Sequence, residues 1–286
     1  MIRKLAGRSY VISKRYALAK MKTSGPPVVV FSMGKTGSTA VARAVHDATG
    51  ARVFQVFRLD GERLAAAEQR YRVRNRAARR RGRDQGALPF PGALHLWESE
   101  YLLGHPPTTS TPWTVITTVR EPIGQAVSAY FHGRGGPLSA RDAPAVDTRI
   151  REIVDDGWIR MPLRWFDREF APALGIDVLD QPFDTGEAYG VIETPTARVL
   201  LIRQENLAAV PAVLGDFLGV GGTVPVPARN EATTKGYAAA YEDFLARARF
   251  PTSVLDHAYG SRYARHFYAD SELARLHERW RGRSGA

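Results

Sequence analysis

The chain has 286 residues, of which 44% are hydrophobic, and its formal net charge is +11. A chain of this length and composition can bury a full core, and the absence of cysteine excludes disulfides, thiolate zinc sites and cysteine nucleophiles. The positive charge favours an anionic partner, such as a nucleotide, a nucleic acid, an acidic glycan or a membrane surface, without choosing among them.

The first 24 residues are rich in lysine and arginine and contain no long apolar run. A secretory signal needs about 7 to 15 apolar residues and a membrane span about 20, and the sequence shows neither. We expect residues 1–24 to form a solvated basic arm, with a helix lying on the inner face of a membrane as the alternative. We expect residues 25–286 to form a single cytoplasmic domain with a helical C-terminal part.

Segments with strand and helix patterns alternate from residue 28 onward. The patterns predict strands at residues 28–31, 53–57, 93–97, 114–119, 176–179 and 198–202. They predict helices at residues 39–49 (closed by Gly50), 61–85, 123–132, 147–170 with a break near Met161 and Pro162, 207–218, and from Tyr237 onward. This alternation predicts an α/β fold with a central, mostly parallel sheet flanked by helices.

Two further segments are open to more than one interpretation. Residues 63–83 contain nine arginines, which indicates either a solvated charge run or a binding face for a polyanionic acceptor or a membrane. Residues 133–145 are rich in glycine and are long enough to form a lid or an insertion that faces the acceptor.

The first chemical motif is the run SMGKTGST at residues 32–39, between the first strand and its helix. A loop there directs backbone N–H groups and a helix N-terminus at one point, and its lysine and hydroxyls add charge and hydrogen bonds, which predicts a phosphate site. The nucleotide triphosphatase pattern fails, because its first glycine falls on Val29 and no second carboxylate for magnesium is evident. The residues expected to bind are Lys35, Thr36, Gly37, Ser38 and Thr39.

The second motif is a strand that ends at Arg120, followed by Pro122 and, on the next helix, by Ser128. An arginine at a strand end can form two hydrogen bonds to a phosphate, proline suits the first turn of the helix, and the serine hydroxyl follows two turns later. This arrangement predicts a second phosphate site.

Together the two motifs resemble those of sulfotransferases that use 3′-phosphoadenosine 5′-phosphosulfate (PAPS), in which a Lys-Ser-Gly-Thr-Thr type loop precedes a strand-Arg-x-Pro-x5-Ser motif. The resemblance implies a P-loop-like sulfotransferase fold, with the 5′-phosphosulfate on the first loop and the 3′-phosphate on Arg120 and Ser128. It also implies 3′,5′-ADP as the product and no metal. Lys235 and Arg229 lie in a later loop that covers the 3′-phosphate in that family, although the Gly-x-Trp-Lys run is missing here.

His95 lies where several sulfotransferases have their general base, so the resemblance implies that it deprotonates the acceptor hydroxyl. Lys35 would then stabilise the charge that develops during transfer. A lone histidine between Leu94 and Leu96 is equally well explained as a hydrogen-bonded core residue, and Glu98 and Glu100 are alternative bases.

The resemblance extends from about residue 28 to Gly219, and the tail with Tyr259 and His266 is similar to a bacterial subgroup labelled capsular polysaccharide synthesis proteins. We therefore expect sulfuryl transfer from PAPS to a hydroxyl of a glycan or glycolipid, with peripheral membrane contact through the basic arm and no nucleic-acid partner. Two alternatives remain: an ATP-dependent kinase of the P-loop type, and a basic protein that binds nucleic acid or membrane without catalysis.

Overall fold

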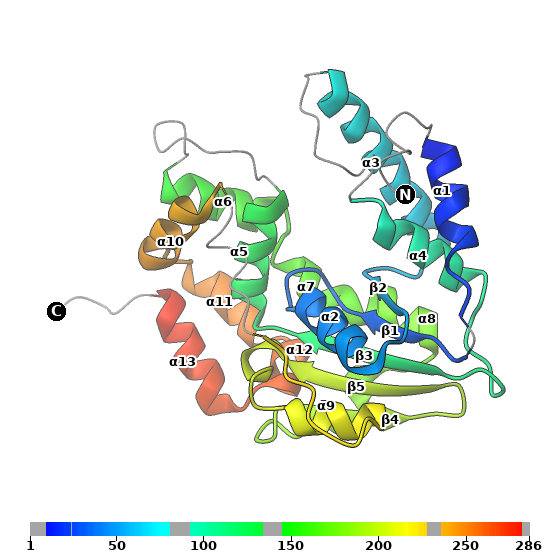
Figure 1. Cartoon of the computed structure of the whole chain (residues 1–286). Helices are drawn as coiled ribbons and strands as arrows, with labels where there is room; N and C mark the ends of the chain where they lie inside the picture. Colours follow the sequence, from blue (N-terminus) through cyan, green and yellow to red (C-terminus); the bar gives the residue numbers. More distant parts are fainter. Residues whose placement is uncertain (1–9, 24, 81–91, 134–144, 228–235, 282–286) are drawn as a thin grey trace.

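The computed structural model describes residues 10–23, 25–80, 92–133, 145–227 and 236–281. Its centre is a five-stranded sheet in the order β2-β1-β3-β5-β4 (Figure 1). The strands are β1 (Val28–Phe31), β2 (Val53–Val56), β3 (Trp113–Val119), β4 (Tyr189–Glu193) and β5 (Ala197–Arg203). All neighbouring strands are parallel except the edge pair β4 and β5, so the α/β class and the mostly parallel sheet are confirmed.

The central strands are continuous apolar runs because both faces of the sheet are covered. Val29 lies opposite Val115 in the sheet, and both contribute to the larger core with the helices of the C-terminal half. Val30 and Ile116 are also paired, and their side chains belong to a smaller core on the other face.

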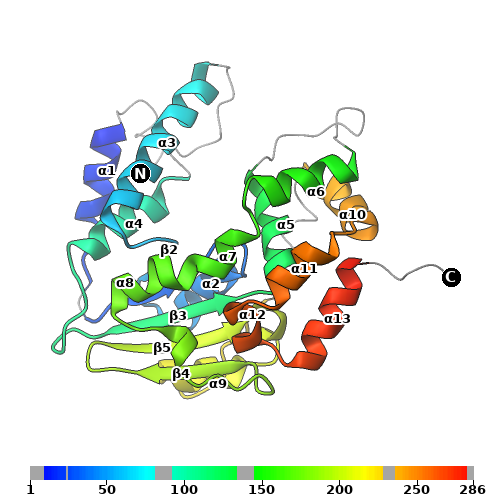
Figure 2. The same ribbon diagram turned by 180° about the vertical axis from the view of Figure 1, so that it is seen from behind.

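The helices cover the two faces unequally. In Figure 1 the front face carries α2 (Ser38–Thr49) and α9 (Pro211–Leu218). The other face, seen in Figure 2, carries α7 (Arg160–Trp165), α8 (Ala171–Leu174) and α12 (Arg262–Phe267). A π-helical turn, Phe166–Phe170, joins α7 to α8.

The remaining helices form two groups that stand apart above the sheet in both views (Figures 1 and 2). The first group lies beside β2 and contains α1 (Tyr10–Ala19), α3 (Gly61–Arg80) and α4 (Leu94–Leu103). The second contains α5 (Pro122–Gly133), α6 (Val146–Asp155), α10 (Ala238–Arg247), α11 (Thr252–Tyr259) and α13 (Asp270–Arg281). No helix in the described ranges is long and apolar enough to cross a membrane.

The strand expected at residues 93–97 is wrong, because this segment begins α4. Its alternation of leucine with polar residues indicated a period of two, but the buried positions Leu96, Trp97 and Leu102 continue with helical spacing. Five residues are too few to separate the two periods. His95 therefore lies on the first turn of a helix and not at a strand end.

The strand expected at residues 176–179 is also wrong. Val178–Asp180 forms a 3-10 turn, and the side chain of Asp177 accepts a hydrogen bond from the Leu179 N–H at 3.0 Å. A local cap of this kind offers the backbone an alternative to strand pairing. The fifth strand of the sheet is instead β4, which the sequence patterns did not predict.

Two helical boundaries differ from expectation. The break in the segment 147–170 falls at residues 156–159, where Gly157 adopts a φ of 75°, while Pro162 lies in the first turn of α7, where proline is tolerated. The helix expected at residues 207–218 begins at Pro211, after a 3-10 turn over Gln204–Asn206.

The described part of the expected basic arm is a docked helix. The Tyr10 hydroxyl accepts a hydrogen bond from Trp97 Nε1 at 2.9 Å, and the Lys14 ammonium pairs with Glu68 at 2.9 Å. Met21, which follows α1, is fully buried. Residues 10–23 therefore belong to the body of the protein.

Candidate functional site

The carboxyl ends of the four parallel strands β2, β1, β3 and β5 lie at one edge of the sheet. The chain leaves β1 to form β2 on one side and later returns to form β3 on the other, so the strand order reverses between β1 and β3. Ligands of open α/β sheets bind at such a switch point, outside the carboxyl ends of the strands. The loop after β1 lies at this point (Figure 1), and Arg120 is the residue that follows β3.

The loop between β1 and α2 has an unusual backbone. Lys35 and Gly37 adopt φ angles of 71° and 84°, and of the described non-glycine residues only Lys35 and Ala188 have a positive φ. A bulky residue in this region is costly and is found mainly at functional sites. A Cβ on Gly37 would lie 2.7 Å from the end of the Leu207 side chain, and the φ of 84° itself favours glycine there.

Buried hydroxyls hold the loop against β3. Thr36 Oγ1 donates to the Met33 carbonyl at 2.9 Å and lies 2.7 Å from the hydroxyl of Thr118. Ser32 Oγ accepts from the Thr118 N–H at 2.9 Å. Since Ser32 and Thr36 are fully buried, the Thr36 side chain supports the loop and leaves its backbone as the part that can face a ligand.

The hydroxyls of Ser38 and Thr39, at the start of α2, share one partner. Gln55 Nε2 on β2 donates to Ser38 Oγ at 3.0 Å and to Thr39 Oγ1 at 2.9 Å. Each hydroxyl accepts from Gln55 and keeps its proton to donate elsewhere, which suits an anion at the helix N-terminus.

The two motifs are in direct contact. Arg120 Nη1 donates to the Lys35 carbonyl at 3.2 Å, and its other guanidinium N–H groups have no acceptor in the described ranges. Gln125 on α5 donates to the Gly34 carbonyl at 2.8 Å, and its buried Oε1 has no partner there. Ser128 is 8% exposed, on the same helix, and its hydroxyl has no partner among the described residues.

A buried carboxylate, Glu121, fixes the start of α5. It accepts from the N–H groups of Ile123 at 3.0 Å and Gly124 at 2.7 Å, and from the side chains of Tyr259 at 2.9 Å and Trp280 at 3.1 Å. Burial raises the pKa of Glu121, whereas the charge of Arg120 and the two side-chain hydrogen bonds act in the opposite direction. The carboxylate therefore connects α5 to the C-terminal helices α11 and α13.

The backbone of Arg120 is held by α12. Tyr263 OH donates to the Arg120 carbonyl at 2.8 Å and accepts from its N–H at 3.2 Å. Glu205, after β5, accepts from the Glu121 N–H at 3.0 Å and from Tyr268 OH at 3.1 Å. The orientation of Arg120 thus depends on residues more than 80 positions away in the sequence.

The three candidate bases lie on α4 in different surroundings. Glu98 is 5% exposed and accepts from the Gln55 N–H at 3.0 Å, and burial raises its pKa to about 7. Glu100 pairs with Lys14. Burial and the charges of Arg58 and Arg74 lower the pKa of His95 to about 4, so its ring is neutral at pH 7.

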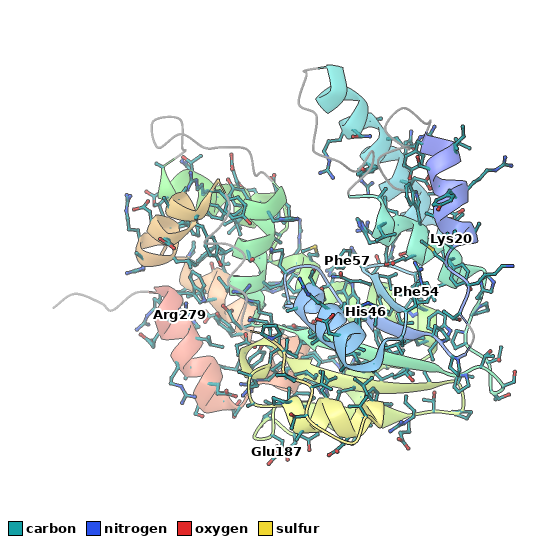
Figure 3. The ribbon with its side chains drawn as sticks, in the orientation of Figure 1. Lys20, His46, Phe54, Phe57, Glu187 and Arg279 are labelled. Carbon is teal, nitrogen blue, oxygen red and sulfur yellow. The ribbon has the colours of Figure 1, made fainter. Side chains whose placement is uncertain are left out.

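His95 lies at the carboxyl end of β2. Its ring packs edge-on against Phe57, with 5.1 Å between the ring centres, and no described residue forms a hydrogen bond with its nitrogens. Figure 3 labels Phe57 on the side of the sheet from which the helical groups rise. His95 is therefore the candidate base whose nitrogens are not bound by the described residues.

A pocket of about 460 Å³ lies next to this segment. Its lining residues are Arg63, Asp156, Gly157, Arg160, Met161, Arg164, Trp165, Arg168 and Glu169. Trp165 Nε1 donates to the Phe57 carbonyl at 3.0 Å, which places the pocket beside the residues that contact His95.

Several residues of this region were not predicted from the sequence. Glu121 lies within the Arg-x-Pro motif itself, so its position was a usable signal, but its partners come from α11 and α13. Gln55 and Gln125 carry no motif. Lys235 and Arg229 lie outside the described residues, as do residues 134–144 of the expected lid. Within the described ranges, no group of three or more His, Asp or Glu side chains could hold a metal ion.

One comparison with known proteins gives a match. A family model described as "Putative capsular polysaccharide synthesis protein" matches residues 147–269. The matched segment contains β5, Glu205, Tyr259 and Tyr263, and lies after both phosphate motifs. No curated protein and no solved structure matches the chain. The match covers less than half of the chain.

Proposed function

We propose that the protein is a PAPS-dependent sulfotransferase with a P-loop-like fold, acting on a hydroxyl of a carbohydrate or glycolipid. The hydrogen bond from Arg120 to the Lys35 carbonyl carries the proposal, because it brings two separate phosphate motifs together at the switch point of the sheet. The match to a polysaccharide synthesis family supports a glycan acceptor.

The residues present fit a nucleotide with phosphates at both ends. The backbone of residues 35–37 and the hydroxyls of Ser38 and Thr39 would bind the 5′-phosphosulfate, with Lys35 as its charged partner. The Arg120 N–H groups that have no described acceptor and the Ser128 hydroxyl would bind the 3′-phosphate, together with Lys235 from the later loop. The buried, unpartnered Gln125 Oε1 supports the presence of a ligand at this point.

PAPS supplies the sulfuryl group in this reaction. The acceptor oxygen forms a bond to sulfur as the bond from sulfur to the 5′-phosphate oxygen breaks, which leaves 3′,5′-ADP. His95, being neutral, takes the proton of the acceptor hydroxyl, with Glu98 as the alternative base. Lys35 stabilises the negative charge on the departing phosphate oxygen.

Arg120→Ala tests the proposal by calorimetry. We expect the affinity for 3′,5′-ADP to fall by roughly 30-fold, because charged hydrogen bonds to the 3′-phosphate are lost, while the affinity for ADP changes less than about threefold. Arg198→Ala is the control, since Arg198 is exposed on β5 and pairs with Glu193 at 2.9 Å. Equal losses for the two nucleotides would contradict the assignment.

The same titrations separate the two other functions. A P-loop kinase would bind ATP with magnesium and gain nothing from the 3′-phosphate. A protein that only binds nucleic acid or membrane would bind DNA or anionic vesicles with strong salt dependence, unaffected by changes at Lys35 or Arg120. In the proposed function the protein acts in the cytoplasm, and its basic N-terminal segment contacts the membrane when the acceptor is a glycolipid.

A further inference from the structure

The pocket beside α7 is dominated by arginine. Four of its nine lining residues are arginines, contributed by α3, α7 and the π-helical turn, and two are acidic. Its volume of about 460 Å³ is within the range of small-molecule sites. The pocket therefore combines the dimensions of a ligand site with an excess of positive charge.

Three of these arginines form no ion pair with a described residue. Arg63 pairs with Glu169 at 3.3 Å and donates to the Arg168 carbonyl. Arg160, Arg164 and Arg168 form no ion pair or side-chain hydrogen bond with the residues that the structure describes, and all three are exposed. Four guanidinium groups around a pocket with two carboxylates leave an excess of positive charge, and an oxyanion between them would reduce their mutual repulsion.

Two backbone and side-chain features favour a bound ligand. Gly157 has a φ of 75°, and a Cβ there would lie 2.9 Å from Arg160 Nη2, so glycine at this position lets the guanidinium lie against the backbone. Glu169 Oε2 is buried and has no hydrogen-bond partner in the described ranges. This oxygen can accept a hydrogen bond from a hydroxyl group of a ligand in the pocket.

Phe57 links the pocket to the candidate base. Trp165 of the pocket donates to the Phe57 carbonyl, and the Phe57 ring contacts His95. Arg58, the next residue, is half-buried between these groups and interacts electrostatically with Glu169, Arg63 and His95. A ligand held by the arginines that extends past Phe57 would reach His95.

We propose that this pocket binds an oxyanion, a carboxylate or phosphate, carried by the sugar acceptor, so that the acceptor is an acidic saccharide. The arginines bind the anionic group, Glu169 accepts from a sugar hydroxyl, and a neighbouring hydroxyl lies toward His95. This inference rests on the proposed sulfuryl transfer for the role of the saccharide, whereas the binding itself is independent of it.

The test uses three sugars that differ only at carbon 6: glucose, glucuronic acid and glucose 6-phosphate. Binding to the full-length protein is measured by calorimetry. We expect at least one of the two acids to bind with a dissociation constant at least tenfold below that of glucose, and the better acid identifies the group as carboxylate or phosphate. Equal binding of all three sugars would overturn the proposal.

The double variant R160Q/R164Q removes two charges and keeps both side chains polar. We expect the preference for the acidic sugar to fall below about threefold. The matched control is R265Q/R275Q, which removes two exposed arginines from α12 and α13 and should keep the preference. An undiminished preference in R160Q/R164Q would contradict the assignment of the pocket.

Titration of 3′,5′-ADP into the same proteins distinguishes this inference from the proposed function. If the wild-type protein prefers the acidic sugar and R160Q/R164Q does not, the pocket is supported even when 3′,5′-ADP fails to bind, and only the sulfotransferase assignment is lost. If 3′,5′-ADP binds all variants equally but no sugar preference exists, the pocket is refuted and the nucleotide site stands.

Discussion

The loop after β1 and the arginine pocket both attract anions, but they are constructed in opposite ways. The loop is held from below by buried hydroxyls of Ser32, Thr36 and Thr118, and its backbone adopts left-handed conformations at Lys35 and Gly37. The pocket has exposed guanidinium groups with few partners. A rigid backbone site suits a ligand of constant shape, such as a nucleotide, whereas flexible side chains suit acceptors that vary.

The largest expected effect comes from Gly37→Ala, which distorts the loop after β1. The methyl group would lie 2.7 Å from the end of the Leu207 side chain, which must move, and the φ of 84° disfavours alanine, so the loop backbone is strained. We expect the affinity for 3′,5′-ADP, measured by calorimetry, to fall by more than about 100-fold.

Gly50→Ala is its matched control. Gly50 closes α2 with a φ of 65°, and no atom lies within 4 Å of its hypothetical Cβ. This variant carries the same kind of backbone strain without the collision. It should lose about 1 kcal/mol of stability and keep its nucleotide affinity. Similar losses of affinity in both variants would mean that backbone strain alone, and not the shape of the loop after β1, lowers the nucleotide affinity.

Glu121→Gln tests whether the contacts of Glu121 with the C-terminal helices α11 and α13 stabilise the segment around Arg120. A carboxamide has one acceptor oxygen, so the N–H of either Ile123 or Gly124 loses its partner. We expect the free energy of unfolding in urea to fall by about 2 kcal/mol. Glu242→Gln, at an exposed position on α10, should change it by less than about 0.5 kcal/mol. A loss of unfolding free energy no larger than that of the control would show that Glu121 does not stabilise the segment around Arg120.

The pH dependence of turnover shows whether His95 or Glu98 is the catalytic base. With His95 as base, whose pKa is lowered to about 4, the neutral form is complete above pH 5.5 and the rate should be flat from pH 6 to 8. With Glu98 as base, whose pKa is raised to about 7, the rate should rise roughly tenfold over the same range. His95→Asn should abolish turnover only in the first case.

The smallest effect is expected from Tyr263→Phe, which removes the hydroxyl bound to the Arg120 backbone. We expect the affinity for 3′,5′-ADP to fall by about fivefold and stability by about 1 kcal/mol, with affinity for the acidic sugar unchanged. Tyr189→Phe on the edge strand is the control. A larger loss of sugar binding than of nucleotide binding would show that the two regions are not independent.

The sequence alone was sufficient to predict the strand, loop and helix at residues 28–49. It was also sufficient to predict the strand, arginine and helix at residues 114–132. In both segments the elements are adjacent in the chain, so hydrophobic period, glycine and proline positions and motif spacing report on them directly. The α/β class followed from the same alternation.

Only the tertiary structure decided the identity of α4, the partners of Glu121 and the existence of the arginine pocket. The five-residue pattern at 93–97 fits two periods, and packing against β2 and α3 selected the helix. Glu121 meets Tyr259 and Trp280 across 138 and 159 positions, respectively. Arg63 and Arg164 are distant in the sequence and line the same pocket. Contacts of this range depend on how the elements fold back on one another, which no local pattern records.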